Sequence, residues 1–372
     1  MRHSVPVTVL EAGSDLSEES RASTFHPPTL DMLDRLGAAQ PLIAQGLSAP
    51  SFQYRSKQHG ILAQFDFGVL ADATDHPYRV QCEQSKLTRI LLSLMRDNSD
   101  FDLQFDSRVV GADQDHSRVH AVIDRKGKRE TRSGRWLIGA DGARSDVRRS
   151  LGIEFEGFTW PERFLVVSTP FDFRAVIPDL VAVSYVCDPQ RWHFLLQIPG
   201  LSRAMFPIAA EESDELALRP EFAQSLMSTV VPGMANYEIA HVTLYKVHQR
   251  VATAFQLGRA FLAGDAAHIN NPLGGMGMNG GIHDAINLTD RLVEVWRGGK
   301  AKAELQRYDR QRRSVTLEYI QTQSIQNKRN LESDGTAFKR ELGEIAADRR
   351  RTRDYLLRVS MIASLRHAQQ LG

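Results

Sequence analysis

Cysteine, an excess of charge of one sign and long apolar runs are all scarce in this sequence, and each shortage excludes a class of protein. Only Cys82 and Cys187 occur among the 372 residues, so neither a disulfide framework nor a four-thiolate zinc site can be built, and a reducing cytoplasm is expected. The 46 Lys and Arg residues nearly balance the 45 Asp and Glu residues, which leaves no global field to attract nucleic acid or an anionic membrane. No apolar run approaches the roughly 20 residues that span a bilayer, so we expect a soluble protein.

The material that is present is typical of a globular enzyme-sized chain. Hydrophobic residues make up 42% of the sequence and charged residues 24%, which excludes a disordered chain and suffices for a core. The length favours two or three domains.

The order of apolar runs and turn residues predicts alternating strands and helices over residues 7–151. Residues 7–11 are short, β-branched and almost wholly apolar, which is typical of a strand covered on both faces in a parallel sheet. Residues 124–134 are expected to form a charged turn. The other predicted elements in this part are helices at 30–37, 85–95 and 144–151 and strands at 103–105, 108–111, 119–123 and 136–142.

The pattern changes to β structure in the middle of the chain. A last strand at 260–263 then precedes a glycine-rich loop and a long helix from about Asn279 to Arg297, and residues 301–371 are predicted to be helical. The strands of the middle part, which we take as a second and mostly antiparallel domain, are predicted at 164–171, 181–187, 192–198 and 203–206.

Glu11 ends its strand where doubly wound folds put the acidic group that binds an adenosine ribose. Many strands end in Glu for solvation alone, and from this residue by itself solvation is the favoured explanation. The Gly-x-Gly-x-x-Gly turn that should precede such a strand is absent, because a complete βαβ unit needs roughly 30 residues and only a handful precede Glu11. A literal match at Gly275, Gly277 and Gly280 lies about ten residues beyond its strand, so we reject it as this fingerprint.

A second acidic turn follows the strand at 260–263. Gly264 and Asp265 lead through Pro272 into a glycine-rich stretch that ends at Asn279. The strand would deliver a carboxylate to a polyol, and the glycines would let a flat ring lie against a helix N-terminus, whose partial positive charge favours anionic character. The glycines alone are compatible with an ordinary loop. The order of the acidic turn, Pro272 and the glycine-rich stretch, taken together, argues against an ordinary loop.

Three blocks of sequence together resemble the FAD-dependent aromatic hydroxylases, the p-hydroxybenzoate hydroxylase-like flavoprotein monooxygenases. The blocks are Glu11 with Arg21 and residues 26–30, residues 141–145 with Arg148, and residues 264–279. Their order and separation also match, so the resemblance extends to about residue 325. It implies an α/β fold, with a doubly wound, glutathione reductase-type FAD-binding domain interleaved with a mostly antiparallel substrate sheet and followed by a helical C-terminus.

The resemblance assigns residues to the adenosine half of FAD. Glu11 would bind the adenosine ribose, and Arg21 would reach the phosphate or ribose region. Gln84 is similar to a family glutamine that contacts the ribityl or pyrophosphate part, and Val109 would offer its backbone to adenine.

The resemblance also assigns residues around the flavin half. Asp141 and Gly142 belong to a motif that the family links to both FAD and NAD(P)H, and Asp141 would hold the adjoining loop through backbone hydrogen bonds. Asp265 would bind the ribityl hydroxyls. The remaining residues expected to bind the cofactor near the flavin ring are Pro272, Gly275, Gly277, Met278 and Asn279.

The activity that the resemblance implies is monooxygenation of a small phenol or aromatic acid, as in aromatic compound catabolism. NADH or NADPH would reduce FAD, oxygen would form a flavin hydroperoxide, and its distal oxygen would be transferred to an electron-rich ring. We expect a cytoplasmic monomer or homodimer without a nucleic acid or membrane partner.

The β region should supply the wall of the substrate site. Tyr185, His193 and Met205 are aromatic or soft residues suited to a planar ligand, but alternation along a strand sends only half of such residues to one face, so ordinary core packing is equally favoured. His268 could relay a proton from a bound phenol, although packing of the flavin loop is the preferred explanation. No catalytic residue is therefore assigned, and no metal site is expected.

The implied domain division is an N-terminally incomplete FAD-binding domain at 1–50, 81–160 and 259–300, a substrate-binding β domain at 51–80 and 161–258, and a helical region at 301–372. Without the glycine turn the chain would lose charge-assisted hydrogen bonds of about 1.5 to 3 kcal/mol each, so we expect weak FAD binding. One alternative is a truncated, non-catalytic remnant acting as a binding protein, with Arg353 and Leu356 on an amphipathic helix. Another is a different flavin oxidoreductase chemistry on the same fold.

Overall fold

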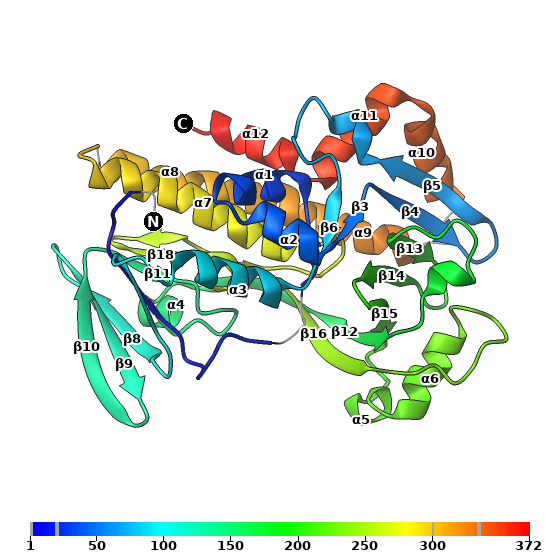
Figure 1. The fold of residues 1–372 in the computed structure, drawn as a ribbon, viewed down its shortest axis with the longest axis horizontal. Coiled ribbons are helices and arrows are strands. Elements are labelled where there is room, and N and C mark those ends of the chain that lie inside the picture. The colour runs from blue at the N-terminus through cyan, green and yellow to red at the C-terminus, as the bar shows by residue number, and fades with distance from the viewer. Residues whose placement is uncertain (1–2, 19–21, 300, 333–335) are drawn as a thin grey trace.

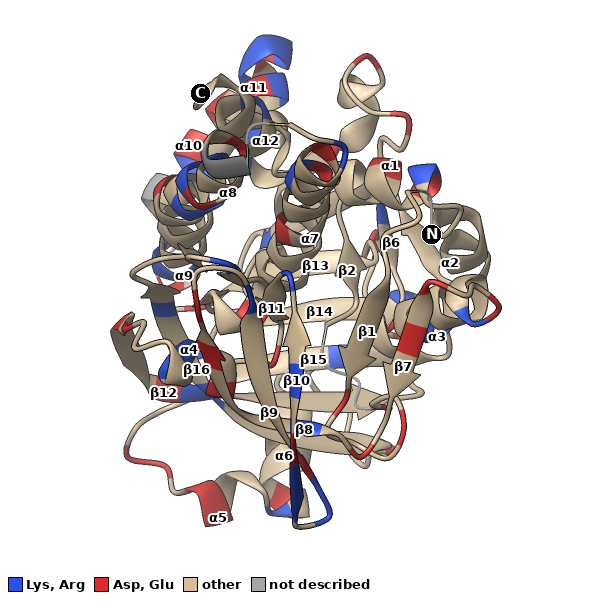
Figure 2. Ribbon diagram, turned by 90° about the vertical axis from the view of Figure 1, so that its left-hand side faces the viewer, with Lys and Arg blue, Asp and Glu red and all other residues tan. Residues whose placement is uncertain are grey.

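The chain forms a mixed α/β structure, shown in Figure 1 as a computed structural model that describes residues 3–18, 22–299, 301–332 and 336–372. A large sheet built from β4 and β5 (residues 51–66) and β12 to β16 (residues 155–252) lies at the lower right in this view. Of the C-terminal helices (residues 301–370), α8 and α12 lie at the upper left, whereas α9 and α10 lie beside β13 and β5 of the sheet. The α/β fold class expected from the sequence is confirmed. In Figure 2, acidic and basic residues are interspersed along the ribbon, in keeping with the net charge of +1.

The large sheet has eight described strands in the order β19-β16-β12-β15-β14-β13-β4-β5. Neighbouring strands in this sheet are antiparallel except for β13 and β4, which are parallel to each other. The expectation of a mostly antiparallel sheet is therefore confirmed. The strands are β4 (Ser51–Ser56), β5 (Gly60–Asp66), β12 (Phe155–Thr169), β13 (Val183–Cys187), β14 (His193–Ile198), β15 (Leu201–Ile208), β16 (His241–Ala252) and β19 (His268–Ile269).

Parallel strands form two smaller sheets. In one, β1 (Val7–Leu10) pairs with β7 (Phe101–Gln104), and in the other β11 (Leu137–Gly139) pairs with β18 (Ala260–Leu262), beside the antiparallel β17 (Gln256–Leu257). The parallel pairing predicted for the first strand is confirmed.

The burial predicted for that first strand is wrong. Val7 is 40% and Val9 is 39% exposed. Exposed side chains point to both faces of β1, and among the described residues the strand has a hydrogen-bonded neighbour only on the β7 side. The apolar sequence of β1 therefore indicates that the strand pairs in a parallel sheet, but it does not indicate that the strand is buried.

The predicted charged turn at 124–134 is also wrong, because most of it is a strand. Residues of β10 (Lys128–Gly134) pair with β9 (Val119–Arg125), which in turn pairs with β8 (Arg108–Gln114). Only Lys126 and Gly127 turn, with φ of 53° and 87°. Since β10 is largely exposed, charged side chains are tolerated along it and the apolar alternation that would have predicted a strand is missing.

Helix α1 (Pro27–Arg35) ends as predicted, with Gly37 at a φ of +77° just beyond it. Helix α7 begins at Met276, about three residues before its predicted start. Glycines in its first turns made the segment look like a loop, yet one of them, Gly281, allows close packing: a Cβ there would lie 3.0 Å from the Cα of Gly264.

The remaining described elements cover the sheets. A three-stranded sheet has the order β2-β6-β3 and lies next to α1 and α3. Its strands and the helices are β2 (Thr24–Phe25), β3 (Leu47–Ala49), β6 (Arg79–Gln81), α1 (Pro27–Arg35), α2 (Ala39–Gln45), α3 (Gln84–Met95), α4 (Asp146–Ser150), α5 (Asp214–Ala217), α6 (Pro220–Ser228), α7 (Met276–Trp296), α8 (Ala301–Val315), a π-helical turn (Thr316–Gln321), α9 (Thr322–Glu332), α10 (Thr336–Ala347), α11 (Arg349–Val359) and α12 (Ile362–Gln370).

The apolar side of α11 packs inside the protein. Leu356 and Val359 of α11, together with Ile362 at the start of α12, are buried in the core that also contains Phe52 and Phe65 of the large sheet. The amphipathic character of this helix is thus used within the chain. Of the helices that the structure describes, none has the length and apolar character needed to cross a membrane.

Candidate flavin site

The acidic turns of the second and third sequence blocks lie at one edge of a parallel sheet. Asp141 follows β11 and Asp265 follows β18, and parallel neighbours have their carboxyl ends at the same edge. Arg148 joins the two turns, since its guanidinium donates to the carbonyl oxygens of Ala143 and Ala266 at 2.8 Å each. Burial lowers the pKa of Arg148, and the nearby Asp141 opposes this shift.

Asp141 accepts hydrogen bonds from the loop that follows it. The backbone N–H of Val147 donates to Asp141 Oδ2 at 3.0 Å, and the hydroxyl of Ser145 donates to Oδ1. Gly142 has a φ of +80°, a conformation that L side chains rarely adopt, so glycine suits this sharp turn.

The Gly264–Asp265 turn is anchored by a buried carboxylate that sequence reasoning missed. Asp284 of α7 accepts from the backbone N–H of Gly264 at 3.1 Å, from Arg312 Nε at 2.7 Å and contacts His268 Nε2 at 3.0 Å. Burial alone would raise the pKa of Asp284, but Arg312 and His268 lower it below its ordinary value. No spacing rule links these residues, because their contact depends on the packing of α7 against α8.

This arrangement gives His268 a packing role. Its ring is 1% exposed and stacks on Phe255 with centroids 5.9 Å apart, while Nε2 faces Asp284. Asp265 itself is exposed at the turn. The turn therefore presents one carboxylate outward on a rigid support.

The N-terminus of α7 lies against the first sequence block. Gly275 caps the helix with a φ of +67°, and a Cβ there would lie 3.1 Å from Thr24 Cβ. Asn279 crosslinks the segments: its Oδ1 accepts from His26 N at 3.0 Å and its Nδ2 donates to Thr24 O at 2.8 Å. The backbone N–H groups of the first helical turn lack intrahelical acceptors and carry the positive end of the dipole.

His26 completes this contact from the other side. Its Nε2 lies 2.8 Å from Gly274 O, which can only accept, so Nε2 carries the proton. Burial first and Arg79 second lower the pKa of His26 well below its ordinary value, so the ring is neutral. The glycine-rich loop is thus fixed by side chains from the far end of the chain.

The other residues predicted to bind near the flavin ring occupy the same loop and helix start. Pro272 is half-buried, and its carbonyl accepts from Gly275 N at 3.0 Å. Gly277 and Met278 lie in the first turn of α7, and Met278 packs against the core cluster that contains Phe25.

The residues predicted for the adenosine half are less enclosed. Glu11 is half-buried, and its Oε1 accepts from Gly13 N at 2.7 Å. Gln84 is the exposed first residue of α3, and Val109 is half-buried in β8. Arg21 lies outside the described residues.

The structure brings two of the three substrate candidates together. Tyr185 pairs with Phe194 and Phe194 with Met205 across neighbouring strands, so the three share one face. This face belongs to the core cluster that includes Leu273 of the glycine-rich loop before α7. His193 lies on the other face.

His193 is enclosed on that other face by apolar residues. Its ring packs on Phe206 with centroids 5.5 Å apart. Burial first, with a contribution from Lys57, lowers the pKa of His193 to about 4. The ring is therefore neutral, and the sheet separates it from the glycine-rich loop before α7.

A buried arginine on the first face was missed by sequence reasoning. Arg203 lies two residues before Met205 on β15 and therefore on the same face. It is 5% exposed and donates to Glu83 Oε1 and Ser23 Oγ at 3.3 Å each. Burial lowers its pKa, and Glu83 opposes the shift. A charged residue inside an apolar strand was the available signal, because such a residue is rarely buried without a partner.

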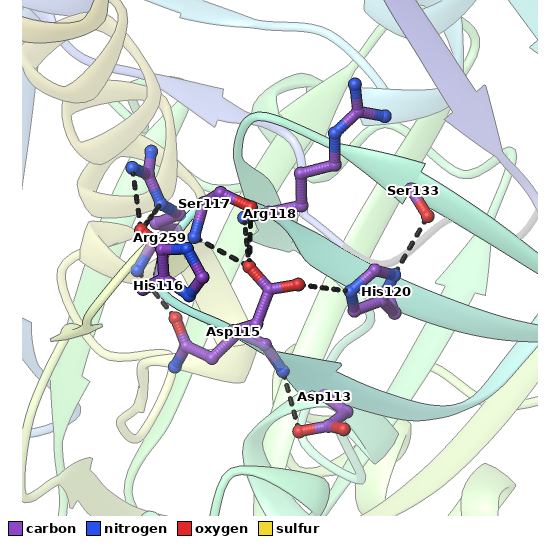
Figure 3. Close-up of polar contacts among 9 residues, drawn as sticks. Asp113, Asp115, His116, Ser117, Arg118, His120, Ser133 and Arg259 are labelled. Atoms are coloured by element: carbon purple, nitrogen blue, oxygen red, sulfur yellow. Dashed lines mark hydrogen bonds and ion pairs between the residues drawn. The ribbon is translucent and has the colours of Figure 1, made fainter.

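A cavity of about 1170 Å³ lies elsewhere, at the amino ends of β11 and β18. Figure 3 shows part of its wall, where Asp115 accepts from the backbone of Ser117 and Arg118 and contacts His120, and Arg259 donates to His116 O. The backbone and hydroxyl of Ser117, then His120, lower the pKa of Asp115. This cavity is at the opposite end of the strands from the acidic turns.

Comparisons of the sequence with known proteins agree with this geometry. The family described as FAD binding domain matches residues 1–323. The chain is 34% identical over 327 residues to para-nitrophenol 4-monooxygenase of Pseudomonas sp. (strain WBC-3), covering 87% of this chain and 80% of that protein. It is 32% identical over 333 residues to 6-hydroxy-3-succinoylpyridine 3-monooxygenase HspB of Pseudomonas putida, covering 87% of this chain and 82% of that protein.

A solved structure extends the match to the whole fold. The crystal structure of p-nitrophenol 4-monooxygenase PnpA from Pseudomonas putida DLL-E4 superposes with a TM-score of 0.89 at 29% identity, over 95% of this chain and 91% of that one. The sequence and fold comparisons thus support the same family as the acidic turns and the N-terminus of α7. The chain belongs to the FAD binding domain family and is an FAD-dependent monooxygenase of the aromatic hydroxylase type.

Proposed function

We propose that this enzyme hydroxylates a small, single-ring phenol that it binds as the phenolate, using NAD(P)H and O2. The observation that carries the proposal is the buried guanidinium of Arg203, which lies on the same face of the large sheet as Tyr185 and Met205. The names of two relatives specify para-nitrophenol and 6-hydroxy-3-succinoylpyridine, each a single ring with a hydroxyl group. These names support a hydroxylated ring as the substrate.

The residues present fit an FAD molecule at the edge of the parallel sheet. Asp265 would bind the ribityl hydroxyls, because it is exposed on a turn that packs directly on α7. The first-turn N–H groups of Gly277 and Met278 would face the electron-rich end of the flavin ring. Glu11 would accept hydrogen bonds from the adenosine ribose, and Asp141 would keep the neighbouring loop in place. When bound, FAD supplies the redox and oxygen-transfer chemistry.

The protein's own contribution is to bind, ionise and shield the aromatic ring. A buried positive charge favours the phenolate over the phenol, and Arg203 would do so by a charge-assisted hydrogen bond to the phenolate oxygen. An ionised phenol is more electron-rich than a neutral one, so the same contact prepares the ring for attack by an electrophilic oxygen. Tyr185 and Met205 would cover the ring face and exclude water. In this position Glu83 would compensate the arginine when no substrate is present.

The test is a substrate screen with the purified, FAD-loaded protein. Phenols are expected to stimulate NAD(P)H oxidation and to yield a product that carries one atom from ¹⁸O2, detected by mass spectrometry. Methyl ethers of the same phenols, which cannot ionise, should stimulate much less. The proposal fails if no phenol changes the rate of NAD(P)H oxidation, or if product forms without label from oxygen.

We further propose a cytoplasmic monomer or homodimer with the three-part division given by the sequence. The pairing of β4 and β5 with the strands of residues 155–269 supports the assignment of residues 51–80 to the substrate-binding part. Sedimentation equilibrium of the purified protein tests the oligomeric state.

A further inference from the structure

The loop before α7 contains two consecutive glycines, which contribute no side-chain contacts of their own. Gly274 and Gly275 have consecutive positive φ values of +98° and +67°. Glycine loses more conformational freedom on folding than any other residue and has no side chain to make contacts. The position of this loop, and of the helix start that follows it, must therefore be set by groups from elsewhere.

Helix α9 supplies such groups on one side of the loop. Asn327 Nδ2 donates to Leu273 O at 3.2 Å. The carbonyl of Ser324 accepts from Asn271 Nδ2 at 3.0 Å, and Asn271 Oδ1 in turn accepts from Leu273 N at 3.1 Å. Both polar groups of Leu273 are thus tied, directly or through one residue, to α9.

The network is closed and buried. Gln249 of β16 connects its parts, because Nε2 donates to Ser324 Oγ at 2.9 Å and Oε1 accepts from Asn271 N at 3.1 Å. Asn327 Oδ1 accepts from Gln323 at 2.8 Å. Ser324, Asn271, Gln249 and Asn327 are all at most 7% exposed. A satisfied buried network of this kind fixes one geometry, since every alternative leaves a polar group unpaired.

The contact with Asn327 is also tight. A Cβ at Gly274 would lie 2.8 Å from Asn327 Nδ2, so the loop backbone lies directly against the amide. Ordinary packing of α9 does not explain polar side chains here, because apolar residues would bury the helix without the need for matched partners. The family match ends at residue 323, so Ser324 and Asn327 lie beyond the region it covers.

We propose that Asn327 and Ser324 are positioning residues that fix the loop from Asn271 to Gly275 and, through it, the N-terminus of α7 relative to the flavin ring. The inference rests on the proposed placement of the ring against α7. A fixed helix start keeps its N–H groups aimed at the reduced flavin, whose negative charge they stabilise. Loosening the loop should therefore weaken this preference for the reduced cofactor.

The first test needs no cofactor. In hydrogen–deuterium exchange of the apoprotein, Asn327→Leu should speed exchange in peptides covering residues 270–278 about fivefold, with other regions unchanged. Gln326→Leu is the matched control, because Gln326 is the exposed neighbour on the same helix. Ser324→Ala is a milder second variant that leaves Gln249 Nε2 without its acceptor. Exchange equal to wild type in both variants would overturn the proposal.

The second test uses the FAD-loaded protein. Asn327→Leu should lower the two-electron reduction potential by about 20 mV, which corresponds to a fivefold weaker preference for reduced flavin. The KM for a phenol should stay within twofold of wild type. A lower melting temperature with an unchanged potential would show a merely structural role, and a changed KM with an unchanged potential would show a substrate contact; either overturns the proposal. Failure of the proposed function appears separately, as a wild-type enzyme that no phenol stimulates.

Discussion

Replacing Asp284 by Asn removes one buried negative charge and keeps the shape of the side chain. Asp284 is fully buried and faces Arg312, which is 1% exposed, across 2.7 Å. Removing one partner of a buried ion pair leaves the other charge uncompensated, which costs about 3 to 5 kcal/mol. We therefore expect Asp284→Asn to lower the free energy of unfolding by about that amount, measured by urea denaturation at pH 7 with an unchanged m-value.

The pH dependence gives an independent check of the same reasoning. Because the folded-state pKa of Asp284 is lowered, its contribution to stability is present above the unfolded pKa of about 3.9 and is lost as the pH falls through the folded pKa. The difference in stability between wild type and Asp284→Asn should therefore shrink below about pH 4. Glu294→Gln, at an exposed site on the same helix, is the control and should change stability by less than about 0.5 kcal/mol. A loss below about 1 kcal/mol for Asp284→Asn would refute the account of the buried pair.

Three further substitutions test other parts of the site and fold. Arg203→Gln should raise the KM for a phenolate substrate roughly 10- to 100-fold in steady-state kinetics, because a charge-assisted hydrogen bond is lost, and an unchanged KM would exclude the phenolate contact. Gly275→Ala should destabilise the folded protein by about 1 to 2 kcal/mol in urea, since φ is +67° and the new Cβ would lie 3.1 Å from Thr24 Cβ. His193, with a folded pKa of about 4, favours unfolding as the pH falls from about 6.5 to 4, because only the unfolded chain then binds the proton. In His193→Gln, the free energy of unfolding should therefore fall by up to roughly 3 kcal/mol less than in the wild type between these pH values. Equal acid unfolding profiles of the two proteins would contradict the burial argument.

The sequence predicted elements whose pattern is local. The end of α1 just before Gly37 and the strands around Phe194 and Met205 follow from the hydrophobic period and from turn residues, which depend on near neighbours. The start of α7 was placed too late because its glycine-rich first turns have the composition of a loop. The close contact of Gly281 with Gly264, which these glycines permit, is visible only in three dimensions.

The supporting residues of the site could not be predicted in the same way. Asp284 and Arg312 come from different helices, and Asn327 reaches the flavin loop from a helix whose sequence carries no motif. Each is polar and buried, which is costly without a partner, and the partner is defined only by the packing of helices. The face of His193 was undecidable for a related reason, since alternation tells which residues share a face but not which face meets the flavin loop.

The two halves of the proposed cofactor site differ in how firmly the fold holds them, and this difference can be measured. Asp265 stands on a turn tied to the buried Asp284, whereas Glu11 follows a strand whose Val7 and Val9 are about 40% exposed. Segments with few buried contacts open at low free energy, so amides of β1 should exchange faster than those of β18. A loosely held partner contributes little net binding, because ligand contacts must first order it. FMN, which lacks the adenosine half, should therefore bind within about tenfold of FAD in a fluorescence titration. Binding of FAD more than about a hundredfold tighter than FMN would show that the β1 edge is ordered well enough for Glu11 to act at full strength.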